Sequence, residues 1–338
     1  MIRNFDVASY YPHQMVLNGY CSRNIPSPAV YAETIERRVK AKKSGDKATA
    51  NALKLVLNTT YGAMLNAYNP LYDPLMGRSV CISGQLQLLE LAEHLVKDCR
   101  TLKLIQLNTD GIMISFDENE YSTVLDITGE WQTRTGFELE EDSVKKIIQK
   151  DVNGYLEVPL TGEPKIKGGV LVRGISPAGA FNINNNATIV ALAVKNYLAY
   201  GVSPETTINN CDDVLSYQFI SKASAKYSMC YHEINGQLVE TQKVNRVYAV
   251  NDYQYGTLYK KHKETGVIAK ISNLPMCCKV DNNNEIKISE INKDWYIGLA
   301  KRYIADFLGE ETANLNARQI KRQQKQILKI LEENNGNN

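Results

Sequence analysis

The sequence lacks the features of a secreted or membrane protein. No apolar run approaches the ~20 residues that cross a bilayer, and the first residues, MIRNFDVASYYP, contain no apolar stretch like that of a signal peptide. The seven cysteines form no C-x-x-C pair, and no His lies at zinc-binding spacing from them. The Cys277-Cys278 pair is interpreted as small core residues, with metal binding as the alternative. We expect a reduced, cytoplasmic protein (host cytoplasm if the chain is viral) without a membrane partner.

Net charge is lacking too. Lys+Arg number 39 and Asp+Glu 37, a balance of +2, so any nucleic-acid-binding surface must be local. Seven basic and three acidic residues lie between Glu33 and Lys54. A basic C-terminal helix is predicted as well, for which three roles stay open: binding duplex phosphates, docking a processivity partner, or simple solvation. Its cations are Arg318, Lys321, Arg322, Lys325 and Lys329.

What is present predicts a mixed α and β fold. A length of 338 residues with 43% apolar composition suffices for two or three domains. Apolar spacing and turn residues predict a strand from Ile2 to Tyr10 and two helices joined by a break at 44–46. They also predict a buried helix and a β-hairpin. The predicted helices span 28–43, 48–65 and 80–98, the hairpin spans 102–116, and helices with Asn-rich connections are expected after 173.

The first segment with possible chemistry follows the first strand. Asp6 comes at the strand end, before a turn at Pro12. A carboxylate there suits Mg²⁺, which prefers oxygen ligands, and exposed backbone N–H groups of the turn suit phosphate. The alternative is an Asp that only caps the turn.

The second segment is polar where a helix is expected. Lys54, Asn58 and Tyr61 are spaced i, i+4 and i+7, which places them on one face. Arg38 and Lys42 are likewise four apart on the preceding helix. Cations from two antiparallel helices suit a triphosphate. The alternative is a solvated basic helix.

The third segment is Asn108-Thr109-Asp110-Gly111 at the hairpin tip. N-x-D-G is a common turn, so Asp110 serving only the turn is the alternative. If Asp110 lies beside Asp6, the two carboxylates can hold two metals ~3.5–4 Å apart for an in-line displacement.

In order and internal spacing, the three segments resemble the motifs of family B DNA polymerases. Residues 6–12 (DVASYYP) are similar to motif A, D-x-x-S-L-Y-P, and residues 54–62 (KLVLNTTYG) to motif B, K-x-x-x-N-S-x-Y-G. Thr109-Asp110 is similar to the end of motif C, D-T-D-S. Softer matches are Asn153-Gly-Tyr155 to the K-x-Y element, Lys165-x-Lys167-Gly168 to the K-G element, and 294–297 to a stretch of the thumb.

The resemblance implies a role for each matched residue. Asp6 and Asp110 would be catalytic and, with the carbonyl of Val7, would bind two Mg²⁺ ions, for which Mn²⁺ substitutes. Tyr11 would be the steric gate that excludes a 2′-OH, and so RNA synthesis. Arg37 and Lys40 are the alternatives to Arg38 and Lys42. Nucleotide-binding residues would be Ser9, Tyr10, Tyr11, Arg38, Lys42, Lys54, Asn58, Tyr61 and Gly62; DNA-binding residues would be Thr109, Tyr155, Lys165, Lys167 and Gly168.

The resemblance also implies an α+β right-hand fold: an antiparallel-sheet palm (1–27 and 66–175), short two-helix fingers (28–65), and a mostly helical thumb with the basic helix (176–338). The expected activity is that of a DNA-directed DNA polymerase, a nucleotidyltransferase that adds dNTPs to a primer on template DNA.

The chain departs from the family pattern in several places. Asn108 replaces the first Asp of motif C, Tyr10 replaces a Leu, and Asn153 replaces the Lys of K-x-Y. Motif A begins at residue 6, with no exonuclease before it. We therefore expect a phage-like split subunit, whose partner carries the exonuclease and N-terminal part, or a truncated product. A non-catalytic DNA-binding subunit that keeps the fold is the alternative.

Overall fold

A computed structural model describes residues 1–173 and 186–310. Their contacts divide the chain into two compact units. The first unit contains Met1–Lys146 and Pro159–Thr161, and the second contains Ile147–Val158 and the described residues from Gly162 onward. This division falls within β4, so the expected limits of palm, fingers and thumb stay predictions. The predicted basic C-terminal helix lies outside the described residues.

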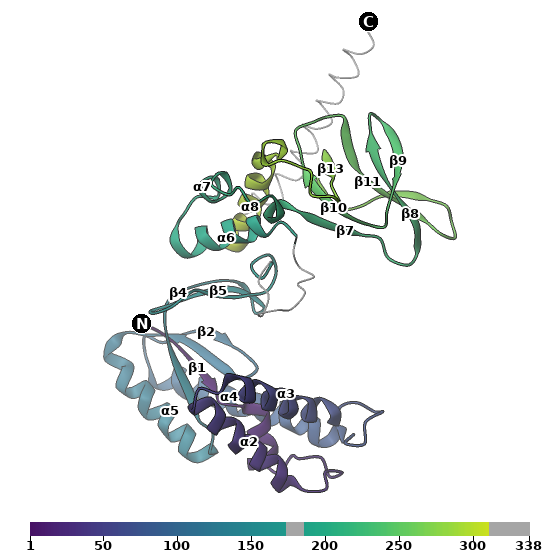
Figure 1. The fold of residues 1–338 in the computed structure, drawn as a ribbon. Coiled ribbons are helices and arrows are strands. Elements are labelled where there is room, and N and C mark those ends of the chain that lie inside the picture. Colours follow the sequence, from purple (N-terminus) through teal and green to yellow (C-terminus); the bar gives the residue numbers. More distant parts are fainter. Residues whose placement is uncertain (174–185, 311–338) are drawn as a thin grey trace, which may run out of the picture. The chain divides into compact units, whose positions relative to one another are not determined.

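The first unit is an antiparallel sheet covered on one face by helices (Figure 1). The strand order is β2-β3-β1-β4. Phe5 and Val7 of β1 and Ile112 and Ile114 of β3 are buried with residues of α4 and α5. The elements are β1 (Ile2–Val7), α1 (Tyr10–Leu17), α2 (Pro28–Lys43), α3 (Lys47–Met64), α4 (Pro74–Asp98), β2 (Lys103–Leu107), β3 (Gly111–Ser115), a 3₁₀ turn (Glu118–Glu120), α5 (Tyr121–Thr135) and β4 (Leu139–Asp151).

The predicted helices and hairpin of this unit are confirmed, although α4 begins at Pro74 rather than at residue 80. The first strand ends at Val7, not at Tyr10, because left-handed Ser9 turns the chain and Tyr10 begins α1.

The helix ends follow local rules. Pro28 starts α2, and Lys40, Lys42 and Lys43 lie in its last turn, where the helix dipole favours cations. Asp46 caps α3 by accepting from the Thr49 N–H at 3.0 Å. Since Tyr31 Oη donates to Leu57 O at 3.1 Å inside a separate small core, α2 and α3 pack as one hairpin.

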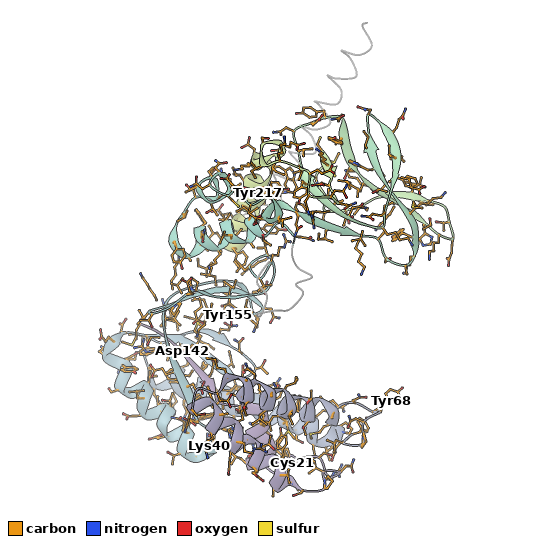
Figure 2. All side chains as sticks on the ribbon, in the orientation of Figure 1. Cys21, Lys40, Tyr68, Asp142, Tyr155 and Tyr217 are labelled. Atoms are coloured by element: carbon orange, nitrogen blue, oxygen red, sulfur yellow. The ribbon has the colours of Figure 1, made fainter. Side chains whose placement is uncertain are left out.

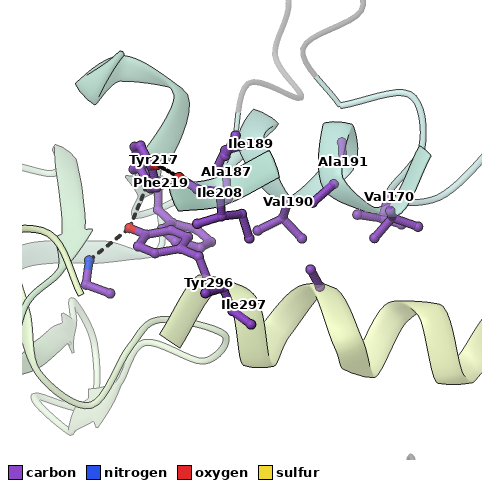
Figure 3. Packing of buried hydrophobic residues seen from close by; sticks show 14 of the residues in the cluster. Val170, Ala187, Ile189, Val190, Ala191, Ile208, Tyr217, Phe219, Tyr296 and Ile297 are labelled. Atoms are coloured by element: carbon purple, nitrogen blue, oxygen red, sulfur yellow. Dashed lines mark hydrogen bonds between the residues drawn. The ribbon is translucent and has the colours of Figure 1, made fainter. Parts of the chain in front are cut away.

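The second unit contains two further antiparallel sheets, in the orders β13-β10-β7 and β12-β11-β8-β9. Its core gathers around Tyr296, whose hydroxyl donates to Tyr217 O at 2.7 Å and accepts from the Ala249 N–H at 3.0 Å (Figure 3). Its elements are the end of β4, β5 (Gly154–Pro159), β6 (Lys165–Lys167), α6 (Thr188–Tyr200), α7 (Pro204–Asn209), two 3₁₀ turns (Val214–Tyr217 and Ile288–Glu290), β7 (Phe219–Lys222), β8 (Tyr227–Ile234), β9 (Gln237–Thr241), β10 (Val244–Ala249), β11 (Tyr255–His262), β12 (Ile268–Lys270), β13 (Cys278–Val280) and α8 (Lys293–Leu308).

The expectation of a mostly helical region after residue 176 is wrong for 186–310, which holds the seven strands β7–β13. The signal was present in the sequence. Asn235-Gly236 joins β8 to β9 with positive φ at both residues (49° and 74°), as a two-residue hairpin turn requires. The strand β7 (FISK) gave no such signal, because its buried residues are Phe219 and Ser221 and its burial alternates without an alternation of polarity. The mixed α+β class itself is confirmed.

Candidate active site

Asp6 is the second-last residue of β1, a strand that lies between β3 and β4. In register it lies opposite Gly111 of β3 on one side and Glu140 of β4 on the other. Its Oδ2 accepts from Asn4 Nδ2 at 2.9 Å. A Cβ placed on Gly111 would lie 2.1 Å from Asp6 Oδ1, so the carboxylate occupies the space that a side chain at residue 111 would fill. Only glycine is compatible with this packing.

Asp110 lies beside Asp6 through the backbone of the hairpin. The Val7 N–H donates to Asp110 O at 2.7 Å, and the Asn108 N–H donates to Gly111 O at 2.8 Å. Thr109 and Asp110 therefore form the two-residue tip between β2 and β3, with Asp110 exposed. The Asn108 side chain accepts from Gln106 Nε2 at 2.6 Å, within the hairpin. The structure thus places Asp6 and Asp110 on adjacent strand ends.

The turn between β1 and α1 has the geometry of an anion nest. Ser9 is left-handed (φ 51°) and Tyr10 begins the helix, a pair of conformations that turns successive N–H groups to one side. The Ala8 N–H donates to Glu138 O at 2.9 Å, and the first helical bond runs from the His13 N–H to Ser9 O at 3.0 Å. The N–H groups of Ser9, Tyr10 and Tyr11 are thus the uncapped first amides of α1.

Two tyrosines of this turn have different surroundings. Tyr10 is buried and its hydroxyl donates to Gly84 O at 2.7 Å, so only its backbone is available to a ligand. The Tyr11 ring packs edge-on against Tyr61 of α3, with centroids 4.7 Å apart. Burial, followed by the contact with Cys81, raises the pKa of Tyr11 to about 12.

Cations of α2 reach the same turn. Arg38 donates to Ser9 Oγ, and Lys42 pairs with Glu140. Arg37 and Lys40 are exposed, and Figure 2 labels Lys40 on α2. Of the two registers left open by the sequence, the one with Arg38 and Lys42 directs its cations toward the end of β1.

The motif B residues lie along α3. Lys54 and Asn58 are exposed, and an added Cβ at the exposed Gly62 would meet no atom within 4 Å. Of these residues, Tyr61 contacts Tyr11, and this contact places the segment 54–62 next to the segment 6–12.

The predicted DNA-binding residues of the second unit form a small hairpin. Lys167 lies opposite Tyr155, with its Nζ 5.6 Å from the ring centroid, and Lys165 Nζ is 3.4 Å from Glu157. Gly168 has φ 74°, and an added Cβ there would lie 1.8 Å from Asn153 O. Residue 168 must therefore be glycine, because its backbone lies directly against the backbone of Asn153. Thr109, by contrast, belongs to the first unit.

The carboxylates of Asp6 and Asp110 and the carbonyl of Val7 are oxygen donors of the type that Mg²⁺ prefers. Two carboxylates and a backbone carbonyl are hard oxygen donors, and Mg²⁺ is commonly held by one or two carboxylates together with water and substrate phosphates. Within 1–173 and 186–310, no group of three or more His, Cys, Asp and Glu side chains is arranged to hold a metal. A Mg²⁺ ion bound to these donors would complete its coordination with oxygens of water or substrate.

Comparison with known proteins supports the fold. No protein-family model matches the chain, and no curated protein sequence matches it. Among solved structures, the chain is similar to the family B DNA polymerase from the hyperthermophilic archaeon Pyrobaculum calidifontis, with a TM-score of 0.53 and 13% sequence identity. The match covers 90% of this chain and 44% of that one, so the chain spans less than half of its neighbour's length. At this identity the likeness shows a polymerase-like fold. Within the described residues, no helix combines the length and hydropathy of a membrane span.

Two residues near the site were not predicted. Glu140, opposite Asp6, lies in the run Glu138-Leu-Glu-Glu-Asp142, whose alternation on a strand places 140 and 142 on one face. Cys81 contacts both Tyr11 and Tyr61. No sequence signal identifies it, because it stands in an ordinary helical pattern.

Proposed function

We propose that the chain is the catalytic part of a DNA-directed DNA polymerase that adds dNTPs to a primer 3′-OH. The observation that carries the proposal is the adjacency of Asp6 and Asp110 along the backbone: Asp6 lies opposite Gly111, the Val7 N–H bonds to Asp110 O, and Gly111 leaves room for the Asp6 carboxylate. The polymerase-like fold supports it.

In this proposal Asp6, Asp110 and the Val7 carbonyl hold Mg²⁺ or Mn²⁺. When bound, a pair of such ions would activate the primer hydroxyl and neutralise charge on the leaving phosphates. The protein's own contribution is to hold the carboxylates in place, with Asn4 orienting Asp6 by its hydrogen bond.

The triphosphate would be bound by backbone and by cations. The amides of Ser9, Tyr10 and Tyr11 offer N–H donors, as nests do for phosphate. Arg38 supplies a planar donor group and Lys42 a point charge beside them. Lys54 and Asn58 extend the surface along α3, with Tyr61 and Gly62 next to the nascent base pair. Tyr11 would pack under the sugar.

Primer-template DNA would contact the hairpin of the second unit. Lys165 and Lys167 would bind phosphates, Tyr155 would support Lys167, and Gly168 would let the backbone approach closely. Asn153 adds no charge, so we expect a softer primer contact than a Lys would give. Thr109 would touch the primer end from the first unit.

A partner that supplies the rest of a polymerase is part of the proposal. The helix α4 buries one face in the core, yet its other face exposes five large apolar side chains by 45–61%. At 100° per residue they lie within about 80° of one another, over about 31 Å of helix. A helix apolar on two faces is typical of one covered on both. The five are Leu75, Ile82, Leu86, Leu89 and Val96.

The occupant we propose for this face is a separate polypeptide that carries the exonuclease and N-terminal part of a polymerase. The chain covers 44% of the length of its structural neighbour, which leaves room for such a part. Replacing Leu86 and Leu89 by Asp should abolish co-purification with such a polypeptide and leave the circular dichroism spectrum unchanged. Co-purification that survives both changes would remove this face from the interface.

A non-catalytic DNA-binding subunit is the second candidate. It is favoured by Asn108, which removes one carboxylate from the hairpin and instead bonds to Gln106. The two candidates differ in whether Asp6 and Asp110 are needed for any measured activity.

Primer extension separates the candidates. With Mg²⁺ we expect extension by the parent and a loss of at least about 1,000-fold in Asp6→Asn and Asp110→Asn, without a change in melting temperature. Asp126→Asn, at an exposed position of α5, is the matched control. Binding of Mn²⁺ to the protein, followed by electron paramagnetic resonance, gives a readout independent of activity. Parental extension by either variant would show the metal assignment to be wrong.

A further inference from the structure

Cys81 of α4 lies between two tyrosines that belong to different helices. Its Sγ is 2.7 Å from the Tyr61 hydroxyl and 3.8 Å from the Tyr11 hydroxyl. The two rings also meet edge-to-face at 4.7 Å, with an interplanar angle of 64°. One thiol thus connects α1, α3 and α4 at the residues predicted to contact the nucleotide.

This thiol is the hydrogen-bond partner that the structure gives to both hydroxyls. Within the described residues, neither Tyr11 Oη nor Tyr61 Oη has another hydrogen-bond partner. The Tyr11 ring also packs against two hydrophobic clusters of the first unit, whereas its hydroxyl end is held by the sulfur of Cys81 and the ring edge by Tyr61. A thiol is a weak donor and a weak acceptor, so it holds the ring with less force than a hydroxyl or an amide would.

We propose that Cys81 is a positioning residue for sugar discrimination: it fixes the Tyr11 ring in place, and Tyr61 braces it from α3. The inference rests on the proposed polymerase function, in which Tyr11 packs under the sugar. A 2′-OH enters only if the ring moves, so rejection of a ribonucleotide depends on how firmly the ring is held. A deoxyribonucleotide needs no such movement and should be indifferent to Cys81.

The decisive quantity is the ratio of kcat/KM for dCTP to kcat/KM for CTP opposite a template dG. Cys81→Ala should lower this ratio roughly three- to tenfold, the range that loss of one modest hydrogen bond gives. The change should come from faster CTP use, with dCTP use within about twofold of the parent. Cys81→Ser restores a donor and acceptor and should return the ratio to near the parental value. Tyr11→Ala defines the full loss of discrimination.

Two further variants distinguish positioning from a general effect on the fold. Tyr61→Phe removes the hydroxyl that bonds to Cys81 and should lower the ratio as Cys81→Ala does. The double variant should lose no more than Cys81→Ala alone, because that change already removes the contact that Tyr61→Phe breaks. Cys211→Ala, a half-buried cysteine of the second unit, is the matched control.

An unchanged ratio in both Cys81→Ala and Tyr61→Phe would overturn the inference. So would an equal fall in dCTP and CTP use, which indicates disruption of the pocket, or additive effects in the double variant. If Cys81→Ala does not fold, Cys81→Ser and Tyr61→Phe decide the question between them. Failure of the proposed function looks different, since the parent would then extend no primer with either nucleotide.

Discussion

The two units of the chain each use one glycine to let two groups approach closely, but for different ends. In the first unit the missing Cβ of Gly111 makes room for a carboxylate, since Asp6 Oδ1 would lie 2.1 Å from it. In the second unit the missing Cβ of Gly168 makes room for backbone, since Asn153 O would lie 1.8 Å from it. The first glycine therefore serves the placement of a carboxylate, and the second serves the shape of a hairpin. Replacing Gly111 should therefore lower activity, whereas replacing Gly168 should lower stability.

Among changes that leave both carboxylates in the chain, the largest effect should come from Gly111→Ala. The new methyl group displaces the Asp6 carboxylate, and a displacement of about 1 Å at a reacting group costs on the order of 100-fold in rate. We expect at least that loss in kcat/KM for dNTP incorporation, while the protein still binds DNA.

The control for this variant is Gly129→Ala in α5, where an added Cβ meets nothing within 4 Å. It should leave the rate unchanged and stabilise the helix by up to about 1 kcal/mol. Equal activity in the two variants would mean that Asp6 is not held where the structure puts it.

Gly168→Ala should act on stability first. Both the left-handed backbone and the overlap with a carbonyl oxygen oppose a side chain, so we expect a loss of about 2–4 kcal/mol in the free energy of unfolding of the second unit. Gly169→Ala shares a positive φ (55°) but has open space, and should cost only about 1–2 kcal/mol. Chemical denaturation of the two variants measures the difference, and equal losses would mean that the Asn153 contact contributes nothing.

A smaller effect is expected from the cations of α2. Arg38→Ala and Lys42→Ala should each raise the KM for dNTP about tenfold, the usual loss for one hydrogen bond to a charged group. Arg37→Ala and Lys40→Ala should change it by less than about twofold, since neither side chain shares the contacts of Arg38 and Lys42 with Ser9 and Glu140. Steady-state kinetics on all four variants tests the register of α2. The reverse pattern would show that the helix presents its other cations to the nucleotide.

The smallest expected effect is a difference in pH response between the units. Burial lowers the pKa of His232, whose Nε2 lies 2.7 Å from Cys278 O. The unfolded chain then binds the proton more tightly, so this contribution to stability is complete above about pH 6.5 and is lost as the pH falls. In the first unit, bonds from Arg23 hold the pKa of the Asp73 carboxyl well below its usual range, so that contribution is lost only below about pH 4.

Hydrogen exchange at pH 7 and pH 5 measures this difference. Acidification over that range should weaken protection in β8 before α4, and His232→Gln should reduce the effect. Equal loss of protection in β8 and α4 would contradict this assignment.

The sequence predicted the first unit well because its signals are local. Pro28 and Asp46 mark helix starts. Asp6, Lys54 and Asp110 were singled out by their spacing within segments that resemble polymerase motifs. The proximity of Asp6 and Asp110 follows from strand pairing, which the motif order anticipated. Glu140 and Cys81 were not predictable in the same way, because their contacts are made across the fold.

The second unit was less predictable because its strands are short and their patterns irregular. β8 and β11 pair with register shifts, so burial does not alternate regularly along them, and β12 and β13 have three residues each. The Asn235-Gly236 turn was the one strong local signal. Helical periodicity was recognisable in α8, which begins at Lys293 behind the cap of Asn292.

Template-directed synthesis is tested most directly by single-nucleotide primer extension opposite each of the four template bases. We predict that with Mg²⁺ the protein adds only the complementary dNTP in each case, and that Asp6→Asn and Asp110→Asn add none. Saturated primer-template binding without extension, in Mg²⁺ and in Mn²⁺ and with the exonuclease and N-terminal polypeptide present, would contradict the proposal and favour a non-catalytic DNA-binding subunit.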